Sequence, residues 1–253
     1  MQPKMNHGSQ PNVRLRRLTV RRGRTTVLRD VDLTLAAGTL TAIIGPSGSG
    51  KSTLLKSLLG RIRPAGGKVE APEGGPVGYV PQDDALHLRL TVDEALHYAA
   101  ALRLPDMSDD ERKGRITHLV ERLGLAERRG LRIGKLSGGQ RKRVSVAMEL
   151  LHEPNVLALD EPTSGLDPAL EARLMALLTE LAAEGRVVVT TTHAMNSLHR
   201  CDQLVILVDG EIAFAGPPME APGWFEAPGL HAIFDVIATK PGAAWARHWR
   251  SAR

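Results

Sequence analysis

The chain has 253 residues, of which 42% are hydrophobic, and a formal net charge of +5 at pH 7 that fits a phosphate-bearing ligand, an anionic membrane surface or a nucleic acid without selecting among them. This length suits one sizeable globular domain, or one domain with a subdomain, and the single cysteine, Cys201, excludes an internal disulfide framework. Because no apolar run approaches the ~18 residues of a spanning helix and the first ten residues lack the apolar centre of a secretory signal, we expect the chain to lie outside the bilayer.

The first part of the chain predicts a strand, a loop and a helix in close succession. Residues 1–12 are interpreted as a flexible polar tail. The segment 31–45, VDLTLAAGTLTAIIG, alternates between apolar and polar residues, turns at a glycine and continues as a buried aliphatic strand. A helix over 51–60 and a short strand over 77–82 should follow.

Two helices with clear start signals come next. Thr91 and Glu94 have the spacing of a capping box, and so do Ser108 and Glu111. Apolar residues at helical spacing follow each box. We therefore expect the stretch from about 83 to 150 to be a helical subdomain inserted into an α/β body.

The α/β pattern then resumes. Strands are expected over 155–160 and 186–193, separated by a helix that Asp167 and Pro168 begin as N-cap and first helical residue. Residues 204–216, LVILVDGEIAFAG, predict a hairpin with an Asp-Gly turn. The fold class is therefore predicted to be α/β.

A glycine-rich loop joins the first buried strand to the first helix. Residues 45–53, GPSGSGKST, fit the pattern G-x-x-x-x-G-K-[ST], and the strand before and helix after disfavour a chance match. Its backbone N–H groups can surround phosphates at a partly positive helix end, Lys51 can reach the β- and γ-phosphates, and the Ser52 hydroxyl can bind Mg²⁺. The predicted phosphate site, which we call the phosphate loop, consists of Gly45, Pro46, Ser47, Gly48, Ser49, Gly50, Lys51, Ser52 and Thr53.

Asp160 and Glu161 end an apolar strand, where ligands sit in open α/β sheets. By itself such an acidic pair is as often a solvated strand end. Beside a phosphate loop, however, Asp160 is predicted to hold Mg²⁺, directly or through water. Glu161 is predicted to polarise the attacking water as the general base.

Two further polar residues end strands, and each has a simpler alternative. Gln82 can bind Mg²⁺ and the attacking water while the loop behind it faces a partner, but in isolation an ordinary loop glutamine is favoured. A lone histidine such as His193 is more often structural. Beside a γ-phosphate, His193 would donate a hydrogen bond and hold the base in place.

A second glycine-rich helix start lies at 136–140, LSGGQ, which we call the signature segment. Ser137 and Gln140 have capping-box spacing, and Gly138 and Gly139 let an oxygen-rich ligand approach the partly positive helix end. Since one nucleotide already has its cradle in the phosphate loop, we infer that the signature segment serves the nucleotide of another subunit. Two copies would then pair head to tail with two shared sites.

Together these motifs resemble the nucleotide-binding domain of ABC transporters over about 13–216. The phosphate loop is similar to Walker A, VLALDEP to Walker B, LSGGQ to the signature, and SGLD, ending at Asp167, to the D-loop. Gln82 and His193 stand where the family has its Q-loop glutamine and switch histidine. The resemblance implies a P-loop NTPase core of the ABC type with an antiparallel β subdomain and an inserted helical subdomain. It also implies ATP and Mg²⁺ as cofactors, a sandwich dimer to which Asp167 contributes, and hydrolysis coupled to a transmembrane partner.

Finer features resemble the G subfamily and its bacterial relatives with ABC-2-type membrane domains. They are VPQDD, LTVDEALHYAAALRLP, SGGQRKRVSVAMELL and the closing FAGPP. In many such relatives the membrane domain is fused to the same chain, and this sequence contains none. The implied partner is thus an ABC-2-type transmembrane domain or permease subunit, with this chain bound peripherally at the cytoplasmic face of the membrane. Export is implied only by the subfamily, and the substrate is not readable.

One departure concerns the base of the nucleotide. The family usually stacks adenine on an aromatic side chain well before the Walker lysine, but no aromatic residue precedes Tyr79. Either Arg21 or Arg22 stacks its guanidinium on the base, or base recognition is weak. We therefore predict modest nucleotide affinity and poor discrimination of ATP from GTP.

The last segment, 217–253, is a separate, aromatic-rich extension. A helical stripe and two tryptophans four residues apart predict either a helix packed on the domain or contact with the membrane interface or membrane subunit. These residues are Leu230, Ile233, Phe234, Ile237, Trp245 and Trp249.

The main alternative function is a soluble ABC ATPase acting on nucleic acid or ribosomes. Translation-type members usually carry two cassettes and chromosome types split the cassette with a long coiled coil, whereas this chain has one compact cassette. The basic stretch 14–24, RLRRLTVRRGR, lacks interleaved aromatic residues and is equally well explained as a solvated strand face. We therefore expect no nucleic-acid partner. A P-loop kinase or GTPase would leave the signature segment unexplained.

Overall fold

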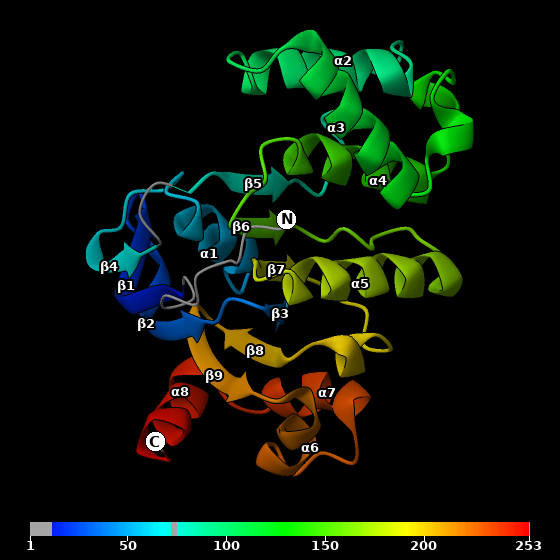
Figure 1. Cartoon of the computed structure of the whole chain (residues 1–253). Helices are drawn as coiled ribbons and strands as arrows, with labels where there is room; N and C mark the ends of the chain where they lie inside the picture. Colours follow the sequence, from blue (N-terminus) through cyan, green and yellow to red (C-terminus); the bar gives the residue numbers. More distant parts are fainter. Residues whose placement is uncertain (1–11, 72–74, 253) are drawn as a thin grey trace, which may run out of the picture.

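The computed structural model describes residues 12–71 and 75–252, which contain two β-sheets (Figure 1). In the larger sheet the strand order is β5-β6-β7-β3-β8-β9, and every neighbouring pair is parallel except β8 and β9. These strands are β3 (Thr39–Ile44), β5 (Val77–Val80), β6 (Val156–Leu159), β7 (Val187–Thr191), β8 (Gln203–Val208) and β9 (Glu211–Gly216). The predicted α/β class is confirmed, whereas the expected tail, 1–12, lies almost wholly outside the described residues.

The central strands of the larger sheet are buried on both faces. Successive side chains of a strand point to opposite faces, so Leu40 and Ala42 of β3 lie in one apolar core and Ile43 lies in the other. Helix α1 (Lys51–Leu58) packs in the same core as Ile43, and helix α5 (Pro168–Ala183) in the core of Leu40. Cover on both faces explains why these strands are continuous apolar runs.

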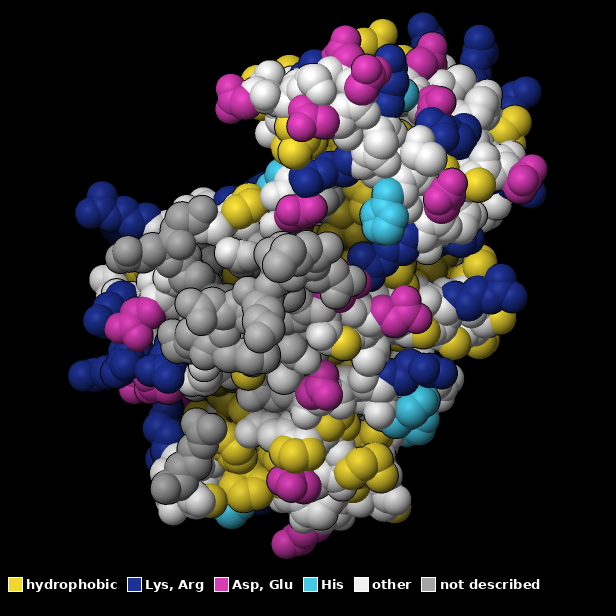
Figure 2. Space-filling model, in the orientation of Figure 1, with side chains coloured by type: hydrophobic (Ala, Val, Ile, Leu, Met, Phe, Trp, Pro, Cys, Tyr) yellow, Lys and Arg dark blue, Asp and Glu magenta, His cyan; other side chains and the backbone are white. Residues whose placement is uncertain are grey.

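The smaller sheet is antiparallel, with strand order β2-β1-β4. It consists of β1 (Val13–Arg22), β2 (Thr25–Leu35) and β4 (Gly66–Glu70). One face packs over α1, and the other exposes arginines such as Arg14, Arg16 and Arg21. Figure 2 shows Lys and Arg side chains gathered on this side of the molecule. The basic stretch 14–24 is therefore a solvated strand face together with its turn.

Three helices stand above the larger sheet in Figure 1: α2 (Val92–Arg103), α3 (Asp109–Arg122) and α4 (Gly138–Leu150). Both predicted capping boxes before α2 and α3 are confirmed; Thr91 Oγ1 accepts the N–H of Glu94 at 3.2 Å, and Glu94 accepts the N–H of Thr91 at 2.8 Å. Helix α4 contacts α2, α3, β5 and α5, so it links this helical group to the sheet. Two 3-10 turns lie between α3 and α4, η1 (Ala126–Arg128) and η2 (Ile133–Lys135).

The C-terminal extension is packed on the domain. It consists of η4 (Pro218–Glu220), α6 (Ala221–Trp224), η5 (Leu230–Ala232), α7 (Ile233–Ile237) and α8 (Gly242–Ser251). One further 3-10 turn, η3 (Leu198–Arg200), lies earlier in the chain, just before β8. Helix α8 lies against β9 and β8, Trp245 is buried, and Trp249 stacks near Phe214 with ring centroids 5.5 Å apart. Of the two alternatives for this segment, the structure supports packing on the domain. None of the described helices combines the length and the apolar character that crossing a bilayer requires.

Candidate nucleotide-binding site

The phosphate loop connects β3 to α1, and its shape depends on glycines. A Cβ atom at Gly45 would lie 2.1 Å from the carbonyl oxygen of Leu207, so no larger residue fits there. Gly50 has a φ of 103° and stands at the N-cap of α1, where no side chain caps the helix. The first N–H groups of α1 are thus left for a ligand, which fits a phosphate.

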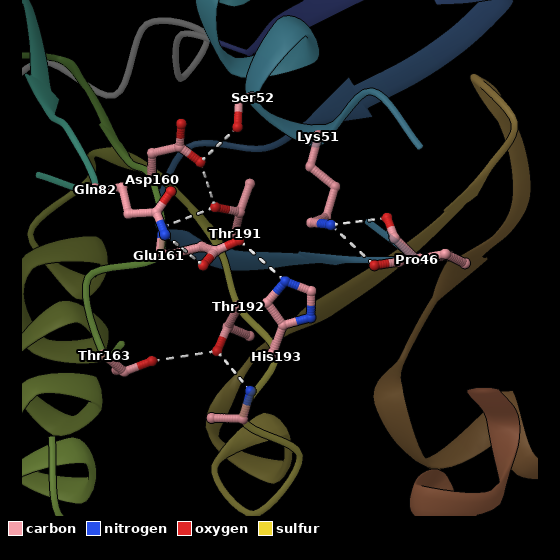
Figure 3. Close-up of polar contacts among 12 residues, drawn as sticks. Pro46, Lys51, Ser52, Gln82, Asp160, Glu161, Thr163, Thr191, Thr192 and His193 are labelled. Carbon is pink, nitrogen blue, oxygen red and sulfur yellow. Dashed lines mark hydrogen bonds and ion pairs between the residues drawn. The ribbon is translucent and has the colours of Figure 1, made fainter. Parts of the chain in front are cut away.

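Two side chains of the loop also lack a strong partner. The hydroxyl of Ser49 is buried and is the one side-chain oxygen or nitrogen so buried without a hydrogen-bond partner among the described residues. The buried ammonium of Lys51 donates to the carbonyl oxygens of Gly45 at 2.9 Å and Pro46 at 3.0 Å, as Figure 3 shows. Burial lowers the pKa of Lys51, and the carboxylates of Glu161 and Asp160 oppose that shift. The unpartnered Ser49 hydroxyl and the Lys51 ammonium, which is bonded only to neutral carbonyl oxygens, fit an anionic ligand with several oxygens.

Asp160 follows β6 and is the centre of a buried hydrogen-bond group. Its Oδ1 accepts from the hydroxyls of Ser52 at 3.0 Å and Thr191 at 2.8 Å, and its Oδ2 accepts from the Tyr79 hydroxyl at 3.3 Å. Burial, together with the charge of Asp160, raises the pKa of Tyr79 to about 12, so the phenol stays a donor. The predicted metal ligands Ser52 and Asp160 are therefore adjacent.

The oxygens of Ser52 and Asp160 fit Mg²⁺ better than they fit a metal ion whose ligands all come from the protein. Within 12–71 and 75–252, no three His, Cys, Asp or Glu side chains gather closely enough to bind a metal. Mg²⁺ is commonly bound by one or two protein oxygens together with substrate phosphates and water. Gln82, the third predicted ligand, contacts Glu161 here and makes no hydrogen bond to Asp160.

Glu161 is held from two sides. Gln82 Nε2 donates to its Oε2 at 3.1 Å, and His193 Nε2 lies 3.0 Å from its Oε1 (Figure 3). The backbone of Glu161 has a φ of 45°, a left-handed conformation that costs about 1–3 kcal/mol outside glycine, and its N–H donates to Thr191 Oγ1 at 2.8 Å. The structure thus brings together the three residues predicted to be catalytic, Gln82, Glu161 and His193.

Sequence reasoning missed Thr191 and Tyr79, which both bond to Asp160. Thr191 also accepts the N–H of Glu161, so one hydroxyl positions both acidic residues. Next to it, Thr192 Oγ1 accepts the N–H of Ala194 at 2.9 Å and lies 3.3 Å from Thr163 Oγ1, which fixes the backbone around His193. The available signal was TTTH at the end of β7, three hydroxyls in a row where a buried strand meets a charged site.

The signature segment lies elsewhere, at the start of α4. Its capping box forms as predicted: Ser137 Oγ accepts the N–H of Gln140 at 3.3 Å, and Gln140 Oε1 accepts the N–H of Ser137 at 3.0 Å. The capping box therefore leaves fewer free N–H groups than an uncapped helix end has. The two that remain belong to Gly138 and Gly139. No hydrogen bond or ion pair joins this segment to the phosphate loop within the described part of the chain.

The glycines of the signature segment also face α5. A Cβ atom at Gly139 would lie 3.3 Å from Leu170 Cδ1, closer than ordinary contact, whereas one at Gly138 would lie 3.6 Å from Leu166 Cδ2. Asp167 caps α5, and its Oδ1 accepts the N–H groups of Ala169 and Leu170 at 3.0 Å. Leu166 and Leu170, which lie on either side of Asp167 in the sequence, thus place Asp167 near the signature segment.

Comparison with known proteins identifies the family. Residues 28–164 match the ABC transporter family. An ABC transporter ATP-binding/permease protein of Mycobacterium tuberculosis is 45% identical over 238 residues, which are 89% of this chain and 28% of that protein. The G family member 26 of Arabidopsis thaliana is 40% identical over 217 residues, 79% of this chain and 32% of that protein. This chain therefore spans about a third of these relatives.

A solved structure supports the same family. cbiO1 from Clostridium perfringens, part of the ABC transporter complex cbiONQ, superposes with a TM-score of 0.75 at 29% identity. The match covers 82% of this chain and 89% of that one. With 82% of this chain covered, the likeness extends well beyond the phosphate loop.

Proposed function

The chain belongs to the ABC transporter family, and on that premise we propose that it is a transporter's ATP-binding part, two copies of which close head to tail around two nucleotides. One observation carries the proposal. The start of α1 offers uncapped N–H groups and a buried ammonium, whereas the start of α4 is not bonded to that loop in its own chain. The phosphate for this second helix end would therefore come from the nucleotide of another copy.

In this proposal the triphosphate is bound by the phosphate loop. Lys51 exchanges the carbonyls of Gly45 and Pro46 for phosphate oxygens, which are stronger acceptors because they are charged. Mg²⁺ would be held by Ser52 and Asp160, with Gln82 as a further ligand, and would neutralise charge on the phosphates. Tyr79 and Thr191 keep the Asp160 carboxylate in place for that role.

Hydrolysis would proceed through Glu161 as general base. The water oxygen attacks the γ-phosphorus, its proton passes to the Glu161 carboxylate, and the bond to the β–γ bridging oxygen breaks, leaving ADP with that electron pair. Each carboxylate oxygen has two acceptor sites, so Gln82 and His193 leave room for the water. Both residues then orient the base without having to release it.

The proposal also covers the domain organisation of the chain and its membrane partner. We divide the chain into a nucleotide-binding domain over 13–216, with the helical subdomain at about 83–150, and an extension over 217–253. A groove of about 310 Å³ runs beside the loop that follows β5, lined by residues such as Tyr79, Pro81 and Met148. A helix of an ABC-2-type membrane domain would dock there, holding the chain at the cytoplasmic face of the membrane. Outward transport rests on the likeness to the G family.

The test is ATP-driven dimerisation of Glu161→Gln. Removing the base should lower turnover by about 100-fold or more, yet leave ATP binding intact, so ATP-bound dimers should accumulate in size-exclusion or light-scattering measurements with Mg-ATP. Glu180→Gln, a change at an exposed glutamate of α5, is the matched control and should turn over ATP normally. A Glu161→Gln chain that binds ATP but stays monomeric at high concentration would refute head-to-tail closure of the chain alone.

A further inference from the structure

Lys142 of α4 is a buried lysine that the nucleotide site does not account for. Only 5% of the residue is exposed, and its ammonium reaches the loop that follows β5. Lys142 Nζ donates to the carbonyl oxygens of Pro81 at 3.1 Å and Gln82 at 3.0 Å, and it pairs with Asp84 Oδ1 at 2.9 Å. All three of its acceptors belong to this one loop.

Among the described residues, all the polar side-chain partners of Asp84 belong to α4. Besides Lys142, Arg141 Nε lies 3.5 Å from its Oδ2, and Ser145 Oγ donates to its Oδ1 at 3.4 Å. A buried ammonium is costly unless paired and hydrogen-bonded, and here the loop supplies everything it needs. We call this contact between Lys142 and Asp84 the clasp.

The same loop reaches the base. Lys142 holds the carbonyl oxygen of Gln82, and the side chain of Gln82 donates to Glu161 at 3.1 Å. At its other end the loop begins from β5, where Glu149 of α4 accepts the N–H of Tyr79 at 3.1 Å. Helix α4 therefore grips this part of the chain on both sides of Gln82.

Helix α4 also begins at the signature segment, one turn before Lys142. A helix moves as a stiff unit over such a distance, so a displacement of Ser137 is passed to Lys142 and to the loop it holds. We propose that the clasp makes Lys142 a positioning residue, which couples the position of the signature end to Gln82 and through it to Glu161 of the same chain. The coupling between two nucleotide sites rests on the proposed head-to-tail function; the positioning of Gln82 does not.

The test is a double-mutant cycle on ATP turnover. Lys142→Met keeps the length of the side chain and removes the ammonium, and it should lower kcat by about 10-fold to 100-fold, because misplacing a catalytic contact by about 1 Å has effects of that size. The dissociation constant for ATP should change less than about threefold, since no hydrogen bond or ion pair joins the clasp to the described residues of the phosphate loop. In a Gln82→Ala background, Lys142→Met should add almost nothing, because its route to Glu161 is already lost.

Three further variants keep the result interpretable. Lys142→Arg keeps the charge and should restore most of the turnover, and Lys113→Met, at an exposed lysine of α3, should behave as the unmodified chain. Asp84→Asn keeps the shape of the clasp and should also reduce kcat. If Lys142→Met does not melt cooperatively, Asp84→Asn replaces it as the test variant. Unchanged turnover in Lys142→Met or Asp84→Asn, or a full additional loss in the Gln82→Ala background, overturns the proposal.

The experiment also separates the two proposals. If the Gln82-dependent loss is seen while Glu161→Gln forms no ATP-bound dimer, the clasp stands and head-to-tail closure fails. If dimers form but Lys142→Met behaves as the control, the clasp fails and the proposed function stands.

Discussion

The chain contains two glycine-rich helix starts that look alike in sequence and differ in structure. Before α1, Gly50 leaves the helix uncapped, and Lys51 and Ser49 are buried beside the open N–H groups. Before α4, Ser137 and Gln140 close a capping box and leave two glycine N–H groups. In the proposed function the first start binds the phosphates within one chain, and the second binds a ligand that another copy brings to it.

The difference has a physical reason. A capping box stabilises a helix by satisfying its first donors, so the same donors cannot bind a ligand. The start of α1 gives up that stabilisation and keeps its donors free. The start of α4 is capped without ligand and has only two free N–H groups, which suits reversible binding of a ligand.

The largest expected effect comes from breaking the first start. Lys51→Met removes the buried ammonium that would contact the phosphates in the proposed function, and turnover should fall by more than about 100-fold, as for loss of a charge-stabilising donor. Lys56→Met, on the same helix and away from the loop, is the matched control. ATP binding by calorimetry and turnover by phosphate release measure both. Normal ATP affinity in Lys51→Met would remove the phosphate loop from the proposed site.

A methyl group added to each start should sharpen the contrast. At Gly45 the new Cβ would lie 2.1 Å from a backbone oxygen of β8. Overpacking typically costs about 1–3 kcal/mol, so Gly45→Ala should lower the free energy of unfolding by at least that much or distort the loop. At Gly139 the nearest atom is a leucine methyl at 3.3 Å, which can yield. Gly139→Ala should therefore cost less than about 1 kcal/mol in urea unfolding while reducing ATP-driven dimerisation. Equal unfolding losses in the two variants would contradict the difference in packing.

Two equivalent capping boxes allow a cleaner comparison. Ser137→Ala and Thr91→Ala each remove a cap and should each lower the free energy of unfolding by about 1 kcal/mol. Only Ser137→Ala should also reduce turnover and dimerisation with ATP, since only that box belongs to the signature segment. Parallel urea titrations and ATPase assays provide the measurement. If Thr91→Ala lowers turnover as much, the effect of Ser137 is one of stability alone.

The smallest expected effect is a pH dependence at Lys51. Burial lowers the pKa of its ammonium below the ordinary lysine value of 10.5, so at alkaline pH the unfolded chain binds more protons than the folded chain. The stability of the nucleotide-free chain therefore gains a contribution as the pH rises through the folded pKa, and ATP affinity falls over the same window as the ammonium is lost. Lys51→Met should lack both trends. A pH series of ATP titrations that is identical for the two chains would contradict this.

Much of the site could be predicted because its signals are local. The phosphate loop, the three capping boxes and the Asp-Gly turn each need only neighbouring residues, and the turn indeed has positive φ at both Asp209 and Gly210. Strand β4 was not placed, since a short strand that starts with two glycines has little periodicity and takes its register from β1. The tryptophans of the extension could be interpreted in two ways because helical spacing does not say which surface covers them; in the structure Trp249 meets Phe214 of β9 and Trp245 meets Phe225.

The sequence by itself determined which groups are present and where helices and turns begin, because glycine conformations, caps and periodicity act over a few residues. Only the tertiary structure decided which of those groups meet. Thr191 and Tyr79 reach Asp160 from strands far apart in the chain, and Lys142 reaches Asp84 and Gln82 from a helix about 60 residues away. Such contacts follow from strand order and helix packing, which depend on burying apolar surface over the whole domain, so a local pattern such as TTTH shows that hydroxyls are present but not which residue they meet.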